Sequence, residues 1–133
     1  MFVARAFVLA VRRFPEINAR WDEAAAESVI QHYVNQRMAA GAPRGLMVPN
    51  IKDSDQLDLT GLAHAVDALV QTARSGKTSP EEMSNGTITI TNIGALGVDA
   101  GTPILNLGGG AAILAFGAVR EIPWVDDGKL LLG

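Results

Sequence analysis

The chain has 133 residues, 48% of them hydrophobic, and a formal net charge of −3. This length favours a single domain over residues 1–133, and the apolar content excludes a disordered chain because enough apolar surface is available to offset chain entropy. The acidic balance, with basic residues scattered along the sequence, excludes the concentrated positive face that binds nucleic acid.

The composition also narrows the chemistry. No cysteine is present, which excludes disulfides, thiolate zinc sites and a cysteine nucleophile. The apolar residues at the start are interrupted by Arg5 and again by Arg12, far short of the ~20 residues that a membrane span needs. We therefore expect a cytoplasmic protein without a membrane partner. The apolar excess further predicts that some surface is buried against other subunits.

The first half of the chain predicts one helix and several short strands. Apolar residues recur every three or four positions from the start, and Pro15 ends the helix that this spacing predicts. Its expected buried face consists of Phe2, Val3, Ala6, Phe7, Ala10 and Val11. The elements expected next are extended segments at residues 17–21, 29–34 and 46–51 (the last interrupted at Pro49), a turn at 23–27 and a loop at Gly41, Pro43 and Gly45.

The second half predicts a longer helix and the remaining strands. Residues 60–75 carry an apolar stripe, with Asp58 as the N-cap and Gly76 as the stop. A short helix opens at Ser79-Pro80. Strands are expected at 87–91, 111–116 and 119–125, and the strand at 111–116 should be central because it is wholly apolar. Asp127-Gly128 should form the turn of a hairpin between 119–125 and 129–132. Strands and helices do not alternate regularly, which predicts an α+β layer fold.

Several residue types could carry chemistry, and most have a simpler interpretation. The glycines at 94, 97 and 101 and at 108–110 lack the spacing of a dinucleotide site, so we expect irregular loops with positive φ. His32, expected in a strand, and His64, expected on a helix, favour structural roles over that of a general base. No histidine and carboxylate pair has metal-ligand spacing, and Asp53, Asp55 and Asp58 are typical of a solvated turn, so we expect no metal site.

Thr91 is the polar residue of most interest. It ends a strand in which threonine and isoleucine alternate, and Asn92 and a glycine-rich loop follow it. A hydroxyl at a strand end can donate a hydrogen bond to a developing oxyanion. The pattern alone favours a buried cross-strand hydrogen bond instead.

Four segments resemble one family in sequence and in order: RRFPEINARWD (12–22), APRGLMVPNIKD (42–53), ARSGKTSPEEMSNGT (73–87) and TITNIGALGVDAGTPILN (89–106). The family is the catalytic core of the dihydrolipoamide acyltransferases, the central subunits of 2-oxo acid dehydrogenase complexes. Its P-R-G-L-x-V-P motif is matched at residues 43–49, and its T-P-I-x-N motif at residues 102–106. The resemblance extends over residues 2–128.

The resemblance implies a chloramphenicol-acetyltransferase-like two-layer sandwich of mixed sheet and helices, here incomplete at both ends. It implies transfer of an acyl group from a dihydrolipoyl arm, presented by another domain, to coenzyme A as substrate, with no cofactor bound to this chain. Thr91 would stabilise the oxyanion, and the site would lie between subunits of a trimer or higher assembly. The lipoyl domain and the dehydrogenase-complex subunits would be the other partners.

The sequence also departs from the family pattern. The family's H-x-x-x-D-G signature is missing, so the general base is absent and we expect this chain alone to be inactive. Gln36 and Arg37 replace small apolar residues, and Leu107 and the following glycines replace a proline and an acidic residue. Two alternatives therefore stay open. One is a non-catalytic assembly module derived from that core, and the other is a small-molecule acetyltransferase that uses coenzyme A without a lipoyl arm.

Overall fold

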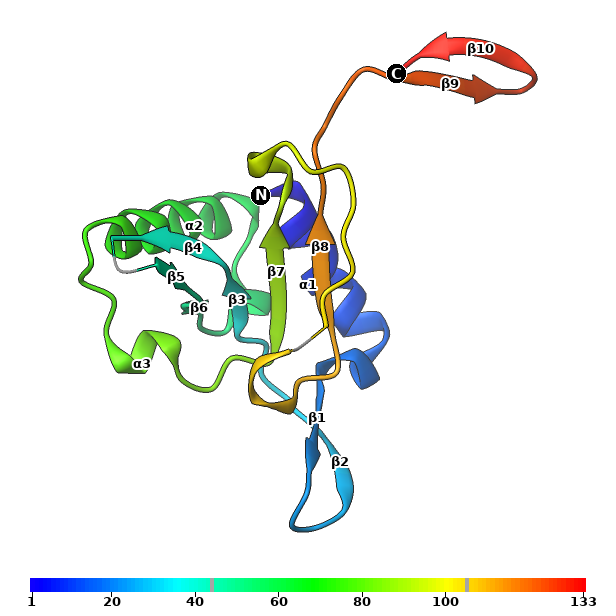
Figure 1. Cartoon of the computed structure of the whole chain (residues 1–133). Coiled ribbons are helices and arrows are strands. Elements are labelled where there is room, and N and C mark those ends of the chain that lie inside the picture. Colours follow the sequence, from blue (N-terminus) through cyan, green and yellow to red (C-terminus); the bar gives the residue numbers. More distant parts are fainter. Residues whose placement is uncertain (44, 105) are drawn as a thin grey trace.

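A four-stranded mixed sheet forms the centre of the protein (Figure 1), in a computed structural model that describes residues 1–43, 45–104 and 106–133. Its strands, in spatial order, are β6 (Asn50–Ile51), β3 (Gln36–Met38), β7 (Ile88–Asn92) and β8 (Ile113–Phe116). Strands β3, β7 and β8 run parallel, and β6 is antiparallel to β3. The sheet therefore places residues 36–38 beside 88–90, and residues 89–92 beside 113–116.

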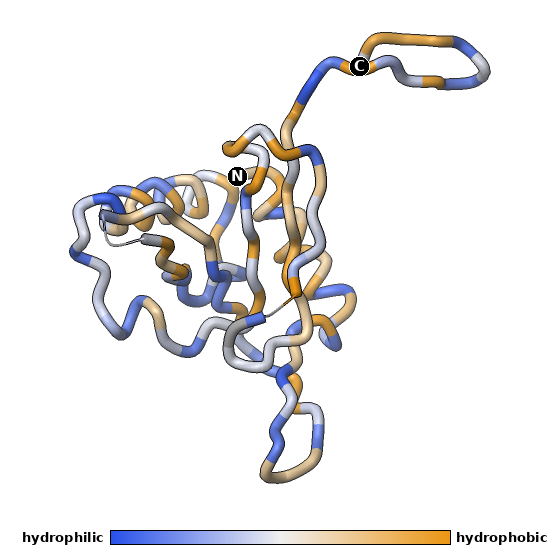
Figure 2. The backbone as a smooth tube through the Cα atoms, in the orientation of Figure 1, coloured by the Kyte–Doolittle hydropathy of each residue, from blue (hydrophilic) through white to orange (hydrophobic). Residues whose placement is uncertain are grey.

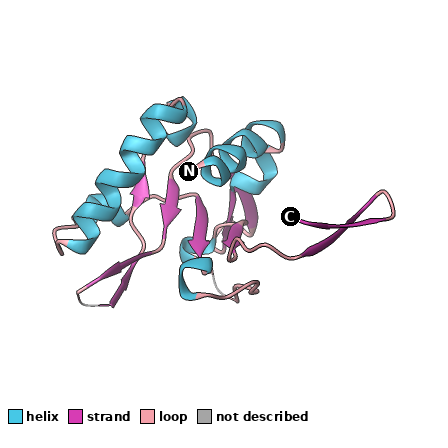
Figure 3. Ribbon diagram, turned by 90° about the horizontal axis from the view of Figure 1, so that it is seen from above, coloured by secondary structure: helices cyan, strands magenta, loops and turns pink. Residues whose placement is uncertain are grey.

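Two helices, α1 (Phe2–Arg13) and α2 (Leu59–Arg74), cover one face of this sheet (Figure 3). Their buried side chains meet apolar residues of the strands, and the two resulting clusters contain Ala4, Ala40, Ile51, Leu62, Leu69, Ala73 and Ile90, and Val8, Val11, Val34 and Ile88. Val66 and Val70 pack at the edge of the first cluster. The apolar stripe predicted on residues 60–75 packs against the sheet, and the α+β fold class is confirmed.

The rest of the chain forms short helices and three antiparallel hairpins. The hairpins pair β1 (Ala19–Asp22) with β2 (Glu27–Ile30), β4 (Ala40–Ala42) with β5 (Gly45–Met47), and β9 (Pro123–Asp126) with β10 (Lys129–Leu132). The short helices are α3 (Pro80–Met83) and the 3-10 turns η1 (Pro15–Asn18), η2 (Ser54–Gln56), η3 (Gly94–Leu96) and η4 (Leu107–Gly109). No helix in the described part of the chain is long and apolar enough to cross a membrane.

The local signals for α2 and α3 are confirmed in detail. The Asp58 carboxylate accepts from the Gly61 N–H at 2.7 Å, and Gly76 follows the helix with φ +69°. At α3, Ser79 and Glu82 form a reciprocal capping box with Pro80 in the first turn. These ends are specified by neighbouring residues alone, which explains why the sequence located them.

Asp58→Ala should destabilise the protein by about 0.5–2 kcal/mol, because it removes the side-chain acceptor at the start of α2. Denaturant unfolding at a fixed protein concentration measures this loss. Asp67→Ala is the control, since Asp67 is an exposed residue in the middle of the same helix. An equal loss in both variants would contradict the capping role of Asp58.

The buried face of α1 was predicted wrongly in part. Val11 is buried and Phe7 packs against both clusters, as expected, but Phe2 is 71% exposed and Ala6 is exposed. The helix instead buries Ala4 and Val8. Ala4 shares a cluster with residues of α2 and β7, where a small side chain permits close approach. The partners of the helix, and not its own apolar pattern, set its orientation.

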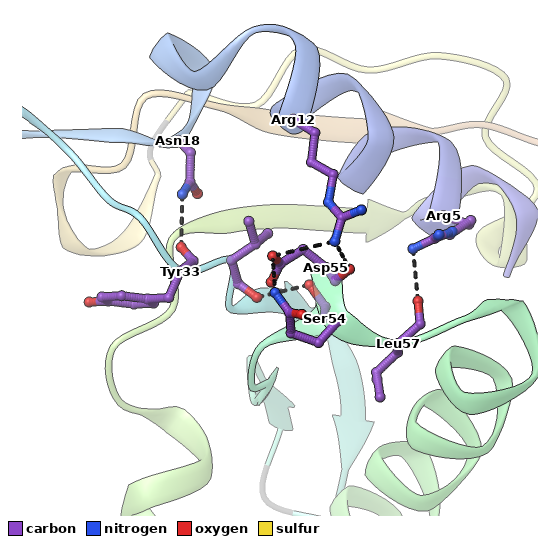
Figure 4. Close-up of polar contacts among 9 residues, drawn as sticks. Arg5, Arg12, Asn18, Tyr33, Ser54, Asp55 and Leu57 are labelled. Carbon is purple, nitrogen blue, oxygen red and sulfur yellow. Dashed lines mark hydrogen bonds and ion pairs between the residues drawn. The ribbon is translucent and has the colours of Figure 1, made fainter.

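The strand predicted at residues 29–34 is also wrong in its second half, because β2 ends at Ile30. Hydrogen bonds from side chains hold the following segment. The Asn18 amide donates to Tyr33 O at 2.8 Å (Figure 4) and to Gln31 O at 2.8 Å. The Ser54 hydroxyl donates to Val34 O at 2.9 Å. These contacts satisfy carbonyl groups that a strand partner would otherwise bind.

Four further expectations need correction. The extended segment expected at 17–21 begins only at Ala19, because η1 continues to Asn18. The loop expected around Gly41 is the β4–β5 hairpin, with Gly41 and Gly45 inside its strands; Arg44 of the same motif lies outside the described residues. Strand β8 lies at the edge of the described sheet and is not central. It is apolar on both faces because Leu114 packs against the helices while Ile113 and Ala115 line a cavity. The strand expected at 119–125 begins only at Pro123.

The β9–β10 hairpin extends away from the sheet and helices (Figure 1), although most of β10 is hydrophobic (Figure 2). Its exposed apolar side chains are Trp124, Val125, Leu130, Leu131 and Leu132. Both faces of a two-stranded hairpin thus carry apolar groups in solvent, and an isolated hairpin of this kind is marginally stable at best.

Candidate active site

The alternation of β7 places two kinds of side chain on opposite faces of the sheet. Ile88 and Ile90 point to the helices and belong to the two apolar clusters. Thr89 and Thr91 point to the other face, where both line a cavity. The period of two in the sequence therefore separates the core from the candidate site.

This cavity has a volume of about 430 Å³, and most of its walls are apolar. It is formed by β7 and β8, by the segment after β7 and by the end of the β4–β5 hairpin, and its lining includes Leu46, Val48, Thr91, Ile93, Thr102, Pro103, Ile104, Asn106, Ile113 and Ala115. Leu105 of the same motif lies outside the described residues. Residues of the 43–49 motif, of β7 and of the 102–106 motif thus meet at one cavity, although they are far apart along the chain.

Thr91 and Thr89 differ in what their hydroxyl groups contact. Thr89 is buried, and its hydroxyl donates to Asn106 Oδ1 at 3.0 Å, while the Asn106 amide donates to Gly110 O and Ala112 O at 2.7 and 3.0 Å. Thr91 is half-buried beside Ala115 of β8, and no described residue is hydrogen-bonded to its hydroxyl. The cross-strand hydrogen bond expected at Thr91 is not found: Thr89, and not Thr91, has a side-chain partner, and that partner lies in the loop before β8. Among the described residues, the Thr91 hydroxyl has no partner that would compete with a ligand.

The backbone that follows Thr91 is fixed by close contacts with the end of β8. Ile93 N–H donates to Phe116 O, and Ala118 N–H donates to Val98 O, both at 2.9 Å. A Cβ at Gly94 would overlap the Gly117 carbonyl, so this approach requires glycine. The element here is a three-residue 3-10 turn, η3, and not the long helix of a dinucleotide site.

Neither histidine lies at this cavity. His32 and His64 are both exposed, and His32 lies in the linker after β2, not in a strand. His32 instead lines a separate cavity of about 370 Å³ together with Arg12 and Asp55. Within the described residues, the cavity at Thr91 therefore contains no side chain that could act as a general base near neutral pH.

The three aspartates of the loop before α2 have separate structural roles. Asp55 forms an ion pair with Arg12 at 3.8 Å, and Arg12 also donates to the Asp55 carbonyl (Figure 4). Asp58 caps α2. Asp53 has a left-handed backbone, with φ +45°. Among residues 1–43, 45–104 and 106–133, no group of three or more metal-ligating side chains is found.

Arg37 has a position that the sequence analysis did not interpret. Its side chain is only 7% exposed, and burial lowers the pKa of its guanidinium. The signal in the sequence that could have indicated this burial was an arginine at a position where the family pattern has a small apolar residue.

The protein is thus an α+β core with two helices on one face of a mixed sheet and an apolar cavity on the other, and comparison with known proteins gives its family. The family model of 2-oxoacid dehydrogenases acyltransferase (catalytic domain) matches residues 1–133. This chain therefore belongs to the 2-oxo acid dehydrogenase acyltransferase family.

Individual relatives support the same assignment. The chain is 39% identical over 124 residues to the dihydrolipoyllysine-residue acetyltransferase component of the pyruvate dehydrogenase complex from Acholeplasma laidlawii, covering 93% of this chain and 23% of that protein. It is 36% identical over 130 residues to the Staphylococcus aureus protein of the same name, covering 98% and 30%. The chain thus spans less than a third of the length of these curated relatives.

Solved structures share the fold. A probable dihydrolipoamide acetyltransferase from Listeria monocytogenes superimposes with a TM-score of 0.90 at 29% identity, covering 98% of this chain and 55% of that one. The dihydrolipoamide acetyltransferase of Azotobacter vinelandii gives 0.89 at 30% identity, covering 98% and 54%. The chloramphenicol-acetyltransferase-like fold expected from the resemblance is confirmed, and the chain spans about half of these catalytic cores.

Proposed function

We propose that this chain forms the oxyanion-stabilising part of an acyltransferase site that moves an acyl group from dihydrolipoamide to coenzyme A within a 2-oxo acid dehydrogenase complex. The observation that carries the proposal is the free hydroxyl of Thr91 in a largely apolar cavity. Family membership supplies the reaction class. In Azotobacter vinelandii dihydrolipoamide acetyltransferase, a serine, a histidine and an asparagine have been examined for roles in the catalytic mechanism.

The reaction needs two contributions. The thiolate of coenzyme A attacks the carbonyl carbon of the acyl thioester, and the carbonyl oxygen becomes an oxyanion. The Thr91 hydroxyl would donate a hydrogen bond to that oxygen, and the apolar walls would strengthen this bond by excluding water. The tetrahedral intermediate then collapses, and the dihydrolipoyl sulfur leaves with a proton.

The second contribution is removal of the thiol proton. His32 and His64 are exposed and lie outside the cavity lining, so neither is placed for this step. Because the relatives are longer than this chain, we propose that the histidine comes from family sequence outside the matched segment or from a neighbouring subunit.

The test is acyl transfer from acyl-dihydrolipoamide to coenzyme A, measured for residues 1–133 alone and for a form that includes the family's histidine segment. We expect turnover only in the second, because loss of a general base lowers the rate by about 10²–10⁴. Robust turnover by residues 1–133 would contradict the proposed division of roles. Absence of turnover in both forms would favour the non-catalytic assembly module.

Self-association is the second part of the proposal. The exposed apolar side chains of the β9–β10 hairpin are suited to packing against another copy of the chain. A related structure, the cubic core of the pyruvate dehydrogenase multienzyme complex, superimposes with a TM-score of 0.89. Lipoyl-domain and dehydrogenase partners, and the cytoplasmic location, stay predictions.

Replacing both Trp124 and Leu131 with serine should abolish or strongly weaken self-association. The two residues are paired across the hairpin, are 60% and 48% exposed, and share one face. Sedimentation velocity over a range of protein concentrations measures the effect. Asp127→Asn, at the turn of the same hairpin, is the control and should leave assembly unchanged. An unchanged sedimentation coefficient for the double variant would place the interface elsewhere.

A further inference from the structure

Arg37 lies on the sheet face opposite the helices. It is in β3, in register with Thr89 of β7, and its side chain is 7% exposed. It belongs to neither of the two apolar clusters and does not line the cavity at Thr91. Arg37 instead lines a second cavity of about 420 Å³ at the opposite end of β7, beside Thr87, and a further one of about 440 Å³ beside Met83.

Glycines make room for this side chain. A Cβ at Gly86 would overlap the Arg37 Nε, and a Cβ at Gly108 would lie 2.9 Å from Nη2. A Cβ at Gly110 would be 3.7 Å from Nη1. The Arg37 side chain therefore lies close to the backbone at three glycines, where a larger residue would displace it.

The positive charge of Arg37 has no partner in the described part of the chain. Its Nη1 is buried and has no hydrogen-bond acceptor, and the ion pairs observed among these residues involve Arg12, Arg20 and Arg120. Burial lowers the pKa of the guanidinium, but an arginine remains charged at neutral pH. A buried charge without compensation is costly, so a compensating anion would stabilise the folded protein.

The walls of the cavity suit an anion. Its lining contains polar and small residues and no carboxylate: Ala19, Arg20, Gln31, Tyr33, Arg37, Asn85, Gly86, Thr87, Gly108 and Gly110. Arg20 adds a second cation, which is paired with Asp22 at 3.6 Å. The amides of Gln31 and Asn85 can also donate hydrogen bonds.

We propose that this cavity is a binding site for a phosphate group, held by the buried guanidinium of Arg37. A planar guanidinium can bind two oxygens of such a group at once, which a lysine ammonium cannot do. This inference does not rest on the proposed acyl transfer. The group could be a free anion or the phosphate of a nucleotide, such as the adenosine 3′,5′-bisphosphate portion of coenzyme A.

Isothermal titration of the intact protein with inorganic phosphate, at ionic strength matched with sodium chloride, tests the proposal. We expect saturable binding to the wild type. Arg37→Gln should weaken binding by about 10- to 100-fold, as expected for loss of a charge-assisted hydrogen bond. Arg37→Lys should retain only part of the affinity. Arg74→Gln removes the same charge from an exposed position on α2 and should bind as the wild type does.

Titration with adenosine 3′,5′-bisphosphate distinguishes the two sources. Tighter binding than inorganic phosphate, lost in Arg37→Gln, assigns the site to a nucleotide phosphate; equal binding assigns it to a free anion. No saturable binding of either probe to the wild type below about 10 mM would overturn the proposal. Equal binding by the wild-type, Arg37→Lys and Arg37→Gln proteins would also overturn it. If a variant does not fold, the wild-type titration alone still tests the proposal.

Discussion

Thr91→Ala is expected to lower kcat for acyl transfer to coenzyme A by about 10²–10³ in a form of the protein that carries the family's histidine segment. The hydroxyl acts on the oxyanion, which exists only in the transition state and intermediate. The KM for coenzyme A should therefore change little while kcat falls. Steady-state kinetics with acyl-dihydrolipoamide as the acyl donor measures both quantities.

Two variants make this expectation specific. Thr91→Ser should retain most activity, because it keeps the hydroxyl that the role requires. Thr102→Ala alters another threonine in the lining of the same cavity and should have a much smaller effect on kcat. Equal losses in Thr91→Ala and Thr102→Ala would indicate that cavity shape, and not oxyanion stabilisation, is responsible.

Leu62→Ala is expected to reduce the free energy of unfolding by about 2–5 kcal/mol, because it leaves a space in a fully buried part of the core. Leu62 is 0% exposed and packs in the cluster that contains Ala4, Ile51 and Ile90. Denaturant unfolding at one protein concentration gives the difference from the wild type, since assembly makes stability depend on concentration.

Leu59→Ala is the matched control, since Leu59 begins the same helix and is 36% exposed. We expect a loss close to the roughly 0.5 kcal/mol of ordinary surface changes. A similar small loss for Leu62→Ala would mean that α2 is not anchored to the sheet by this side chain. A loss in both variants near 4 kcal/mol or more would point to a general effect on α2 and not to burial.

Some elements were predictable because their causes are local in the sequence. The limits of α2 follow from the Asp58 cap and Gly76, and α3 follows from the capping box of Ser79 and Glu82. The alternation of β7 was read correctly, since a period of two directly reports two faces of a strand. The Asp127-Gly128 turn likewise predicted the β9–β10 hairpin.

Other features depended on partners that are distant along the chain. The rotation of α1 is set by the place where Ala4 fits against α2 and the sheet, so its own apolar residues did not reveal it. Asn18, from another segment, interrupts the strand expected at 29–34 by binding its carbonyl groups. Strand β8 was predicted as central because both of its faces are apolar, although it lies at an edge of the described sheet.

The sequence by itself determined the family, the fold class and the identity of Thr91 as the candidate residue, because motifs and strand periodicity are carried by short runs of residues. Only the tertiary structure decided that Thr89 is bound to Asn106 while Thr91 is free, and that Arg37 is buried beside Gly86 and Gly108. These facts depend on which side chains meet across β3, β7 and the loop before β8. Such contacts depend on packing and backbone hydrogen bonding over the whole chain, and no short run of sequence determines them.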